Sequence, residues 1–229
     1  MKLIRIHNIL VELERKPIKN MYLRILPPEG RVHISAPIRM SDEEINRFVA
    51  SKEEWILKHQ ARMENRPAPR QYQYHSGEQV KLWGSTYTLI LREGVTQNRV
   101  EIIGDEIILN IKSGSTEDMR RKLLKSWYRK ALEAEIPFLI ARWEQEMGVS
   151  SSGFVIRDMK SRWGSCNIRT KQICLNLQLA KLPMRCLEYV VVHELVHLLE
   201  RNHNKVFQAY MDRYLPDWRI IKRELNGLE

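Results

Sequence analysis

The chain has 229 residues, of which 43% are hydrophobic and 29% charged, so it can bury a core and is not a disordered tail. Its net charge of +10 favours contact with phosphates or acidic surfaces but does not indicate a fold. No apolar run is long enough to cross a bilayer, and three cysteines without CxxC spacing give no sign of a disulfide framework or a zinc knuckle. Because the N-terminus also lacks the features of a signal peptide, we expect a cytoplasmic protein without membrane contact.

Alternating apolar and polar residues predict a β-rich N-terminal region, residues 1–112, with one helix. The predicted strands cover residues 3–13, 21–26, 31–37, 80–94 and 98–112, with turns at Pro27–Gly30 and at Gly104–Asp105. Ser41 and Glu44 fit a capping box, and the helical spacing that follows predicts a helix from about residue 42 to about residue 63. The Pro-containing stretch 65–71 is interpreted as a linker.

Residues 113–229 predict a helical region around a small sheet. A helix over about 117–147 contains Pro137, which should kink or divide it, and Gly148 is the expected C-terminal cap. Short strands are expected at 154–158 and 173–179, and a helix from about 183 to about 201. The fold class is therefore α+β, and we expect the two regions to form one compact unit.

The last of these helices contains His193-Glu194-Leu195-Val196-His197, the motif that carries the chemistry. Residues four apart lie on the same face of a helix, so the two imidazoles can converge on one ion, and neutral imidazole suits Zn²⁺. Glu194 lies one step round the helix. From there its carboxylate can reach a zinc-bound water and act as general base.

His203 is the candidate for the third zinc ligand, because a zinc site needs at least three protein ligands. The three histidines repeat the ligand spacing of the metzincin motif, but Glu200 stands where that motif has a glycine, which argues against a metzincin. We expect the helix to end near Arg201 or Asn202 and His203 to open the next helix. The pattern predicts one zinc per chain, held by His193, His197 and His203.

The chain resembles the YgjP-like metallopeptidase family, a relative of the SprT-type zincins, over nearly its whole length. The segments that carry the resemblance are VHISAP (32–37), WILKH (55–59), Arg162 to Cys166, Leu175-Asn176, Tyr189 to His197, Asn202-His203 and Phe207. The resemblance implies a zincin-like site with the three histidines as ligands and Glu194 as base. Members of the family are described as metal-dependent hydrolases or peptidases, and a pyrophosphatase activity on UTP has also been attached to it.

Residues outside the zinc motif are expected to contact the substrate. The loop 160–166 should face the metal, where Arg162 could stabilise an oxyanion or a phosphate as part of the catalytic apparatus. Trp163 is either a core residue or a substrate contact. In the strand expected at 173–179, Asn176 lies on the face opposite the leucines and is a further candidate for substrate binding. If this is an edge strand beside the helix, an extended peptide could pair with it.

Three functions stay open at this point. The leading hypothesis is a zinc metallopeptidase, in which a zinc-bound water activated by Glu194 attacks a peptide carbonyl of a protein or peptide substrate. The alternative is a metal-dependent pyrophosphatase of nucleoside triphosphates such as UTP, favoured by the basic residues Arg157, Lys160 and Arg162 near the loop. A weaker alternative is a DNA-associated, SprT-like protease. The dispersed positive charge supports only non-specific contact with nucleic acid.

Overall fold

The computed structural model describes residues 2–26, 29–64 and 73–227. The chain divides into two compact units, Met1–Gln71 and Tyr72–Glu229. This division differs from the boundary expected at residue 112 and from the expectation of one compact unit, because strands 79–111 share their hydrophobic core with the helices that follow. The turn expected at Pro27–Pro28 and the linker expected at 65–71 lie outside the described residues.

The first unit contains a four-stranded sheet with the order β1-β2-β4-β3. Its strands are β1 (Lys2–Ile6), β2 (Ile9–Lys16), β3 (Tyr22–Leu26) and β4 (Arg31–Pro37). The central pair β2 and β4 is parallel, and the two outer pairs are antiparallel. The single strand expected at 3–13 is a hairpin instead, because His7 adopts a left-handed conformation with φ of 50° and reverses the chain.

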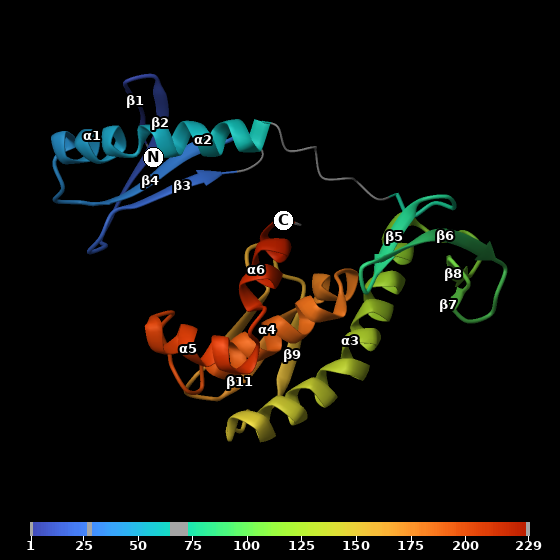
Figure 1. Cartoon of the computed structure of the whole chain (residues 1–229). Coiled ribbons are helices and arrows are strands. Elements are labelled where there is room, and N and C mark those ends of the chain that lie inside the picture. Colours follow the sequence, from blue (N-terminus) through green and yellow to red (C-terminus); the bar gives the residue numbers. More distant parts are fainter. Residues whose placement is uncertain (1, 27–28, 65–72, 228–229) are drawn as a thin grey trace. The chain divides into compact units, whose positions relative to one another are not determined.

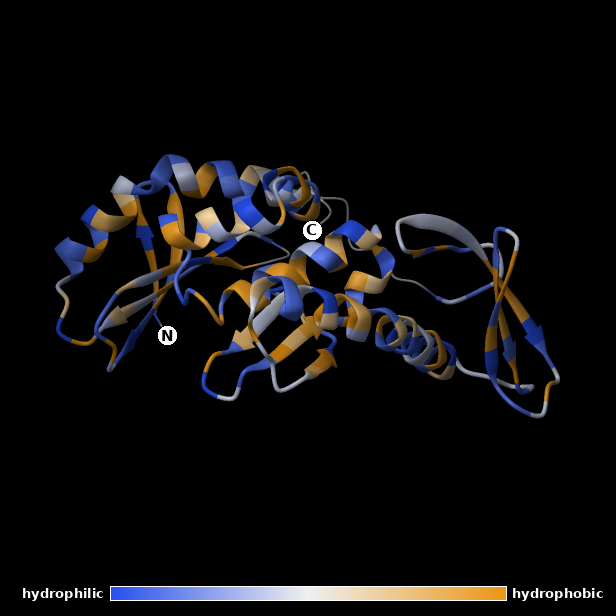
Figure 2. Cartoon of the chain, turned by 60° about the horizontal axis from the view of Figure 1, so that its bottom comes forward, coloured by the Kyte–Doolittle hydropathy of each residue, from blue (hydrophilic) through white to orange (hydrophobic). Residues whose placement is uncertain are grey.

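Two helices, α1 (Asp42–Ser51) and α2 (Glu53–Glu64), lie across one face of this sheet (Figure 1). The capping box is confirmed: the backbone N–H of Glu44 donates to the Ser41 hydroxyl, and the Glu44 carboxylate accepts from the Ser41 N–H. The one helix expected over 42–63 is broken at Lys52, whose ψ of 5° departs from helical geometry. Hydrophobic and hydrophilic residues alternate along the strands (Figure 2), so one face of the sheet is available for a core.

The second unit begins with another four-stranded sheet, of order β5-β6-β8-β7. Its strands are β5 (Gln79–Leu82), β6 (Ser85–Glu93), β7 (Arg99–Ile103) and β8 (Glu106–Ile111). The order and the directions of pairing repeat those of the first sheet, strand for strand. The strand expected at 80–94 is a hairpin that turns at Trp83–Gly84, while the turn at Gly104–Asp105 lies where it was predicted.

A long helix, α3 (Glu117–Met147), follows this sheet. The Thr116 hydroxyl accepts a hydrogen bond from the N–H of Met119 at its start, and Gly148 ends it in the left-handed conformation, as predicted. Pro137 lies inside the helix without dividing it. The apolar side of α3 is buried against the second sheet and against residues 156–225, and these parts together form one continuous core.

The remaining elements surround a three-stranded sheet of order β10-β11-β9. They are β9 (Phe154–Arg157), β10 (Gly164–Asn167), β11 (Gln172–Asn176), the 3-10 helix η1 (Leu177–Lys181), α4 (Met184–Val196), α5 (Lys205–Tyr214) and α6 (Trp218–Gly227). The strand expected at 173–179 stops at Asn176, because the Asn176 side chain accepts a hydrogen bond from the N–H of Gln178 and starts η1. The order of the sheet makes β11 its central strand and β10 an edge strand.

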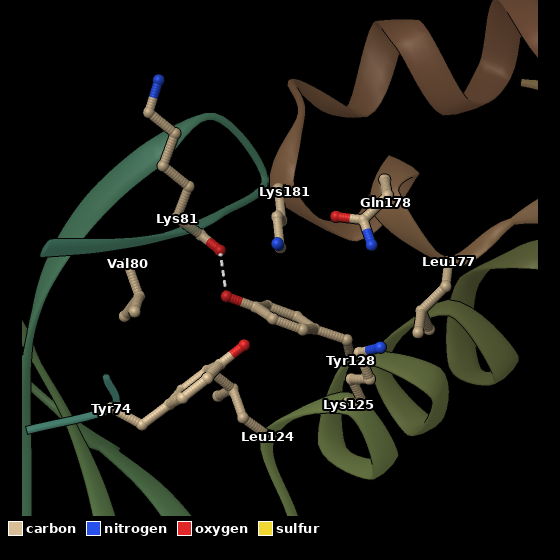
Figure 3. A pocket seen from close by; sticks show the side chains of 9 residues that line it. All are labelled: Tyr74, Val80, Lys81, Leu124, Lys125, Tyr128, Leu177, Gln178 and Lys181. Carbon is tan, nitrogen blue, oxygen red and sulfur yellow. Dashed lines mark hydrogen bonds between the residues drawn. The ribbon is translucent and has the colours of Figure 1, made fainter. Parts of the chain in front are cut away.

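Hydrogen bonds attach the second sheet to α3 and to η1. The Tyr128 hydroxyl in α3 donates to the carbonyl oxygen of Lys81 in β5 at 2.7 Å, beside a cavity of about 30 Å³ (Figure 3). The N–H of Trp83 donates to the carbonyl oxygen of Ala180 in η1 at 2.8 Å. These contacts tie the second sheet to α3 and to η1, the 3-10 helix that precedes α4. No helix in the described part of the chain has an apolar stretch long enough to cross a bilayer.

Candidate metal centre

Three imidazoles converge at the end of α4. His193 lies in the last turn of α4, His197 directly follows the helix, and His203 lies two residues before α5. One ring nitrogen of each histidine lies within 4.8 Å of the others, and the Nε2 atoms of His193 and His203 are 2.9 Å apart. The structure therefore brings together the three residues that were predicted as zinc ligands.

The chain reverses between His197 and His203, so that the third histidine faces the first two. The helix expected to reach residue 201 ends at Val196 and tightens into i to i+3 hydrogen bonds, from the N–H of Leu198 to Leu195 and from the N–H of Leu199 to Val196. His203 does not open α5, because Asn204 is its N-cap and accepts a hydrogen bond from the N–H of Phe207.

The environment of the rings suits a divalent metal. Burial, together with the other two imidazoles and Lys222, lowers the pKa of His193 to about 3, and burial lowers the pKa of His197. Both rings are therefore neutral and have lone pairs to offer at ordinary pH. The Nδ1 atom of His197 lies 3.3 Å from the carbonyl oxygen of Glu200, which leaves its Nε2 for the metal.

Phe207 packs beneath all three imidazoles. Its ring centroid lies 4.9 Å from those of His193 and His197 and 4.7 Å from that of His203, and the residue is 2% exposed. An apolar floor restricts the orientations of the rings and lowers the local dielectric constant. The three converging imidazoles and this packing fit a Zn²⁺ ion held by three nitrogen ligands with one position open.

Glu194 is buried beside the metal centre, at 4% exposure. Burial raises the pKa of its carboxyl to about 8, while the charge of Arg162 and a hydrogen bond from the backbone of Cys166 oppose that rise. A divalent cation bound to the neighbouring histidines would favour the ionised form. Binding of a cation would therefore shift Glu194 towards the carboxylate form, in which it can accept a proton.

Gly164 provides the space that Glu194 occupies. A Cβ atom at residue 164 would lie 2.6 Å from Oε1 of Glu194 and 2.7 Å from Cγ1 of Val190, so no larger residue fits without displacing the carboxylate. The glycine is required by this close approach of β10 to α4.

Gly164→Ala should lower kcat/KM by about tenfold to a hundredfold, because it displaces Glu194 or the start of β10, and should cost about 1–3 kcal/mol in unfolding free energy. Enzyme kinetics and chemical denaturation measure the two effects. Gly227→Ala is the matched control, since a Cβ there meets no atom within 4 Å. Wild-type activity in Gly164→Ala would show that Glu194 tolerates displacement.

Glu194→Gln should stabilise the metal-free protein at pH 8 but not at pH 4.5. The carboxyl pKa rises to about 8 on folding, so the native state resists ionisation and loses stability as the pH rises above 4.5, the ordinary value. Gln removes this cost, which grows by about 1.4 kcal/mol for each pH unit between 4.5 and 8, so Tm at pH 8 should rise by at least several degrees. Calorimetry in chelator at both pH values measures the difference. Glu133→Gln, at an exposed position of α3, should leave Tm unchanged at both pH values. A rise in Tm of Glu194→Gln that does not depend on pH would contradict this explanation.

The structure places two of the other predicted site residues, Arg162 and Trp163, at cavities beside Glu194 and buries the third, Asn176, away from them. Arg162 and Glu194 line the same cavity, and Trp163 lines a neighbouring one. Asn176, expected to bind substrate, is 3% exposed and does not line these cavities. Its amide nitrogen donates to the carbonyl oxygens of Met159 and Arg162 at 2.9 and 2.8 Å, so it holds the loop in place.

A cavity of about 650 Å³ opens over the metal centre. One wall is β10 and the residues after it, from Gly164 to Arg169, and the other carries Glu194 and the three histidines. Arg169 and Arg201 line it together with Arg162, while Arg157 and Lys160 do not. Reasoning from the sequence missed Arg169 and Arg201, although Arg169 lies three residues after the loop 160–166 and Arg201 lies between His197 and His203.

Comparison with known proteins adds a family match. The sequence profile described as "YgjP-like, metallopeptidase domain" matches residues 19–228. Crystal structures of two metallopeptidase zymogens are similar. Abylysin of Pyrococcus abyssi has 19% identity, a TM-score of 0.37 and coverage of 39% of this chain and 90% of its own. Jannalysin of Methanocaldococcus jannaschii has 21% identity, a TM-score of 0.37 and coverage of 41% of this chain and 95% of its own. No curated protein matches the sequence.

Proposed function

Because this chain belongs to the YgjP-like metallopeptidase family, we propose that it is a zinc-dependent peptidase that cleaves extended segments of protein or peptide substrates. The observation that carries the proposal is the convergence of three imidazoles beside one buried carboxylate. A zinc ion there would polarise the peptide carbonyl and lower the pKa of a coordinated water towards ~7.

The chain's own residues supply the proton transfers and the charge. Glu194 takes a proton from the attacking water and gives it to the leaving amine, which requires the ionised carboxylate at the start of the reaction. The guanidinium of Arg162, whose charge acts on Glu194, is suited to stabilise the negative oxygen of the intermediate.

The edge strand β10 is suited to align the substrate. We had expected peptide pairing at the strand of residues 173–179, but β11 lies in the centre of its sheet, so that idea is wrong. β10 pairs only with β11 among the described strands, and its residues line the cavity over the metal centre. An extended peptide could add to this free edge and so pass its carbonyl over the histidines.

Zinc-loaded protein tests the proposal when it is incubated with an unfolded protein such as reduced, alkylated casein, and in parallel with UTP. The expected result is cleavage of casein that chelator abolishes, that zinc restores and that Glu194→Gln lacks. Glu133→Gln serves as the control variant. Zinc-dependent release of pyrophosphate from UTP, absent in Glu194→Gln, with casein left intact, would overturn the peptidase assignment.

One observation favours that second function, a nucleoside triphosphate pyrophosphatase. Arg162, Arg169 and Arg201 all line the cavity over the metal centre, and guanidinium groups bind phosphate in a bidentate manner. In a pyrophosphatase, the double variant Arg169→Ala, Arg201→Ala should raise the KM for UTP strongly. In a peptidase without contacts to these side chains, it should change casein cleavage little.

A further inference from the structure

A second cavity, of about 160 Å³, lies beside the metal centre between α4, the start of β10 and α6. Gly164, His193 and Glu194 line both this cavity and the one over the metal, so the two meet at the catalytic carboxylate. A water molecule in the liquid occupies ~30 Å³, so the space is large enough for a side chain or a terminal residue of a substrate.

The walls of this cavity are apolar and its rim is polar. Trp163, Tyr189, Val190 and Leu225 form the walls, and Lys222 and Asn226 of α6 complete the lining. Tyr189 and Val190 are buried in α4, whereas Lys222 and Asn226 are exposed. Such walls accommodate the aliphatic stem of a side chain, and the rim can then contact a polar group at its end.

The polar atoms of the cavity are mostly donors. Nε1 of Trp163 and Nδ1 of His193 are buried, and neither has a hydrogen-bond partner among the described residues. When Nε2 of His193 binds a metal, its Nδ1 carries the proton and must donate. Buried donors without partners are costly, so a ligand whose acceptor oxygens reached them would lower that cost.

Lys222 adds a positive charge at the same place. Lys222 lines the cavity together with His193 and Glu194. Its Nζ lies 5.6 Å from the centroid of the Trp218 ring, and no carboxylate in residues 2–26, 29–64 and 73–227 forms an ion pair with it. Apart from Glu194, the cavity contains no acidic side chain that could neutralise this charge.

We infer that the second cavity binds a carboxylate of the substrate and that Lys222 determines this preference. The carboxylate is either an acidic side chain next to the scissile bond or the C-terminus of the peptide, because both present two acceptor oxygens on a short stem. The inference rests on the proposed peptidase function, since it names the substrate class of the same site.

A binding experiment tests the inference without turnover, on zinc-loaded Glu194→Gln protein by calorimetry. Three N-acetylated tripeptides serve as probes: Ala-Ala-Glu with an amidated end, Ala-Ala-Gln with a free end, and Ala-Ala-Gln with an amidated end. The first presents only a side-chain carboxylate, the second only a terminal one, and the third none. We expect one of the first two to bind about tenfold to a hundredfold more tightly than the third, and the stronger of them identifies the source of the carboxylate.

Substitutions of Lys222 separate its role from direct binding of a carboxylate to the metal. Lys222→Met keeps the apolar stem and removes the charge, so the preference should vanish, and Lys222→Glu should reverse it. Arg223→Ala removes a charge from the same helix outside the cavity and should leave the preference intact. Equal binding of all three peptides, or a preference that survives Lys222→Met, would overturn the inference.

Cleavage of a peptide library by the zinc-loaded wild type then distinguishes a failure of the carboxylate pocket from a failure of the proposed peptidase function. We expect cleavage sites with Asp or Glu next to the scissile bond, or sites at free C-termini, and the loss of this bias in Lys222→Met. Glu194-dependent cleavage without such a bias would refute the carboxylate pocket and leave the peptidase standing. Absence of any cleavage, with the carboxylate preference retained in binding, would refute the peptidase alone.

Discussion

Glu194→Gln should retain one zinc per chain and lose turnover by about 10²- to 10⁴-fold, the usual contribution of a positioned general base. The carboxylate is not one of the three converging ligands, so its conversion to an amide removes the proton acceptor and no metal ligand. Gln has the same shape and fits the space beside Gly164. Elemental analysis and peptide cleavage on the same preparation measure the two quantities.

The exposed carboxylate of Glu133 provides the control for this substitution, because its conversion to Gln changes the same functional group on the surface of α3. Zinc lost together with activity would show that Glu194 contributes to metal binding. Activity retained with zinc bound would place the proton acceptor at another group and remove Glu194 from the mechanism.

Replacement of His193, His197 and His203 by Ala should reduce bound zinc from one per chain to near zero and abolish activity, because no other group of three ligands in the described residues can replace them. The added zinc should also cease to raise Tm, since a ligand stabilises only the state that binds it. Elemental analysis after dialysis and thermal unfolding with and without zinc provide the two readouts.

His75→Ala is the control for this variant, as His75 is an exposed histidine that contacts Arg120 and belongs to no ligand cluster of the described residues. It should bind zinc as the wild type does. Stoichiometric zinc in the triple variant would refute the ligand set. The circular dichroism spectrum must also match that of the wild type, because Phe207 packs on all three rings and could lose its support.

Local sequence signals were sufficient to predict helix ends, which are fixed by contacts within a few residues. Ser41 and Glu44 predicted the start of α1, and Gly148 predicted the end of α3, because caps and left-handed residues act within a few positions of the chain. The spacing of His193 and His197 predicted two rings on one helical face for the same reason. His203 was within reach because only six residues separate it from His197.

Tight turns without a distinctive signal were missed. The hairpins at His7 and at Trp83–Gly84 interrupt runs that alternate correctly, because the apolar pattern continues across both turns. For the same reason the two four-stranded sheets were not seen as a repeat. Their common order is a property of pairing between strands, and several different residue patterns satisfy it.

The sequence alone therefore predicted three candidate metal ligands and Glu194 as the candidate base, since those residues are close along the chain and their chemistry follows from their type. Only the tertiary structure decided which groups complete the site. Contacts between distant segments made β11 central and β10 the edge, turned Asn176 inward, and brought Arg169, Arg201 and Lys222 to the cavities. Such contacts depend on how sheets and helices pack, and packing energy is spread over many side chains, so no single residue signals it in advance.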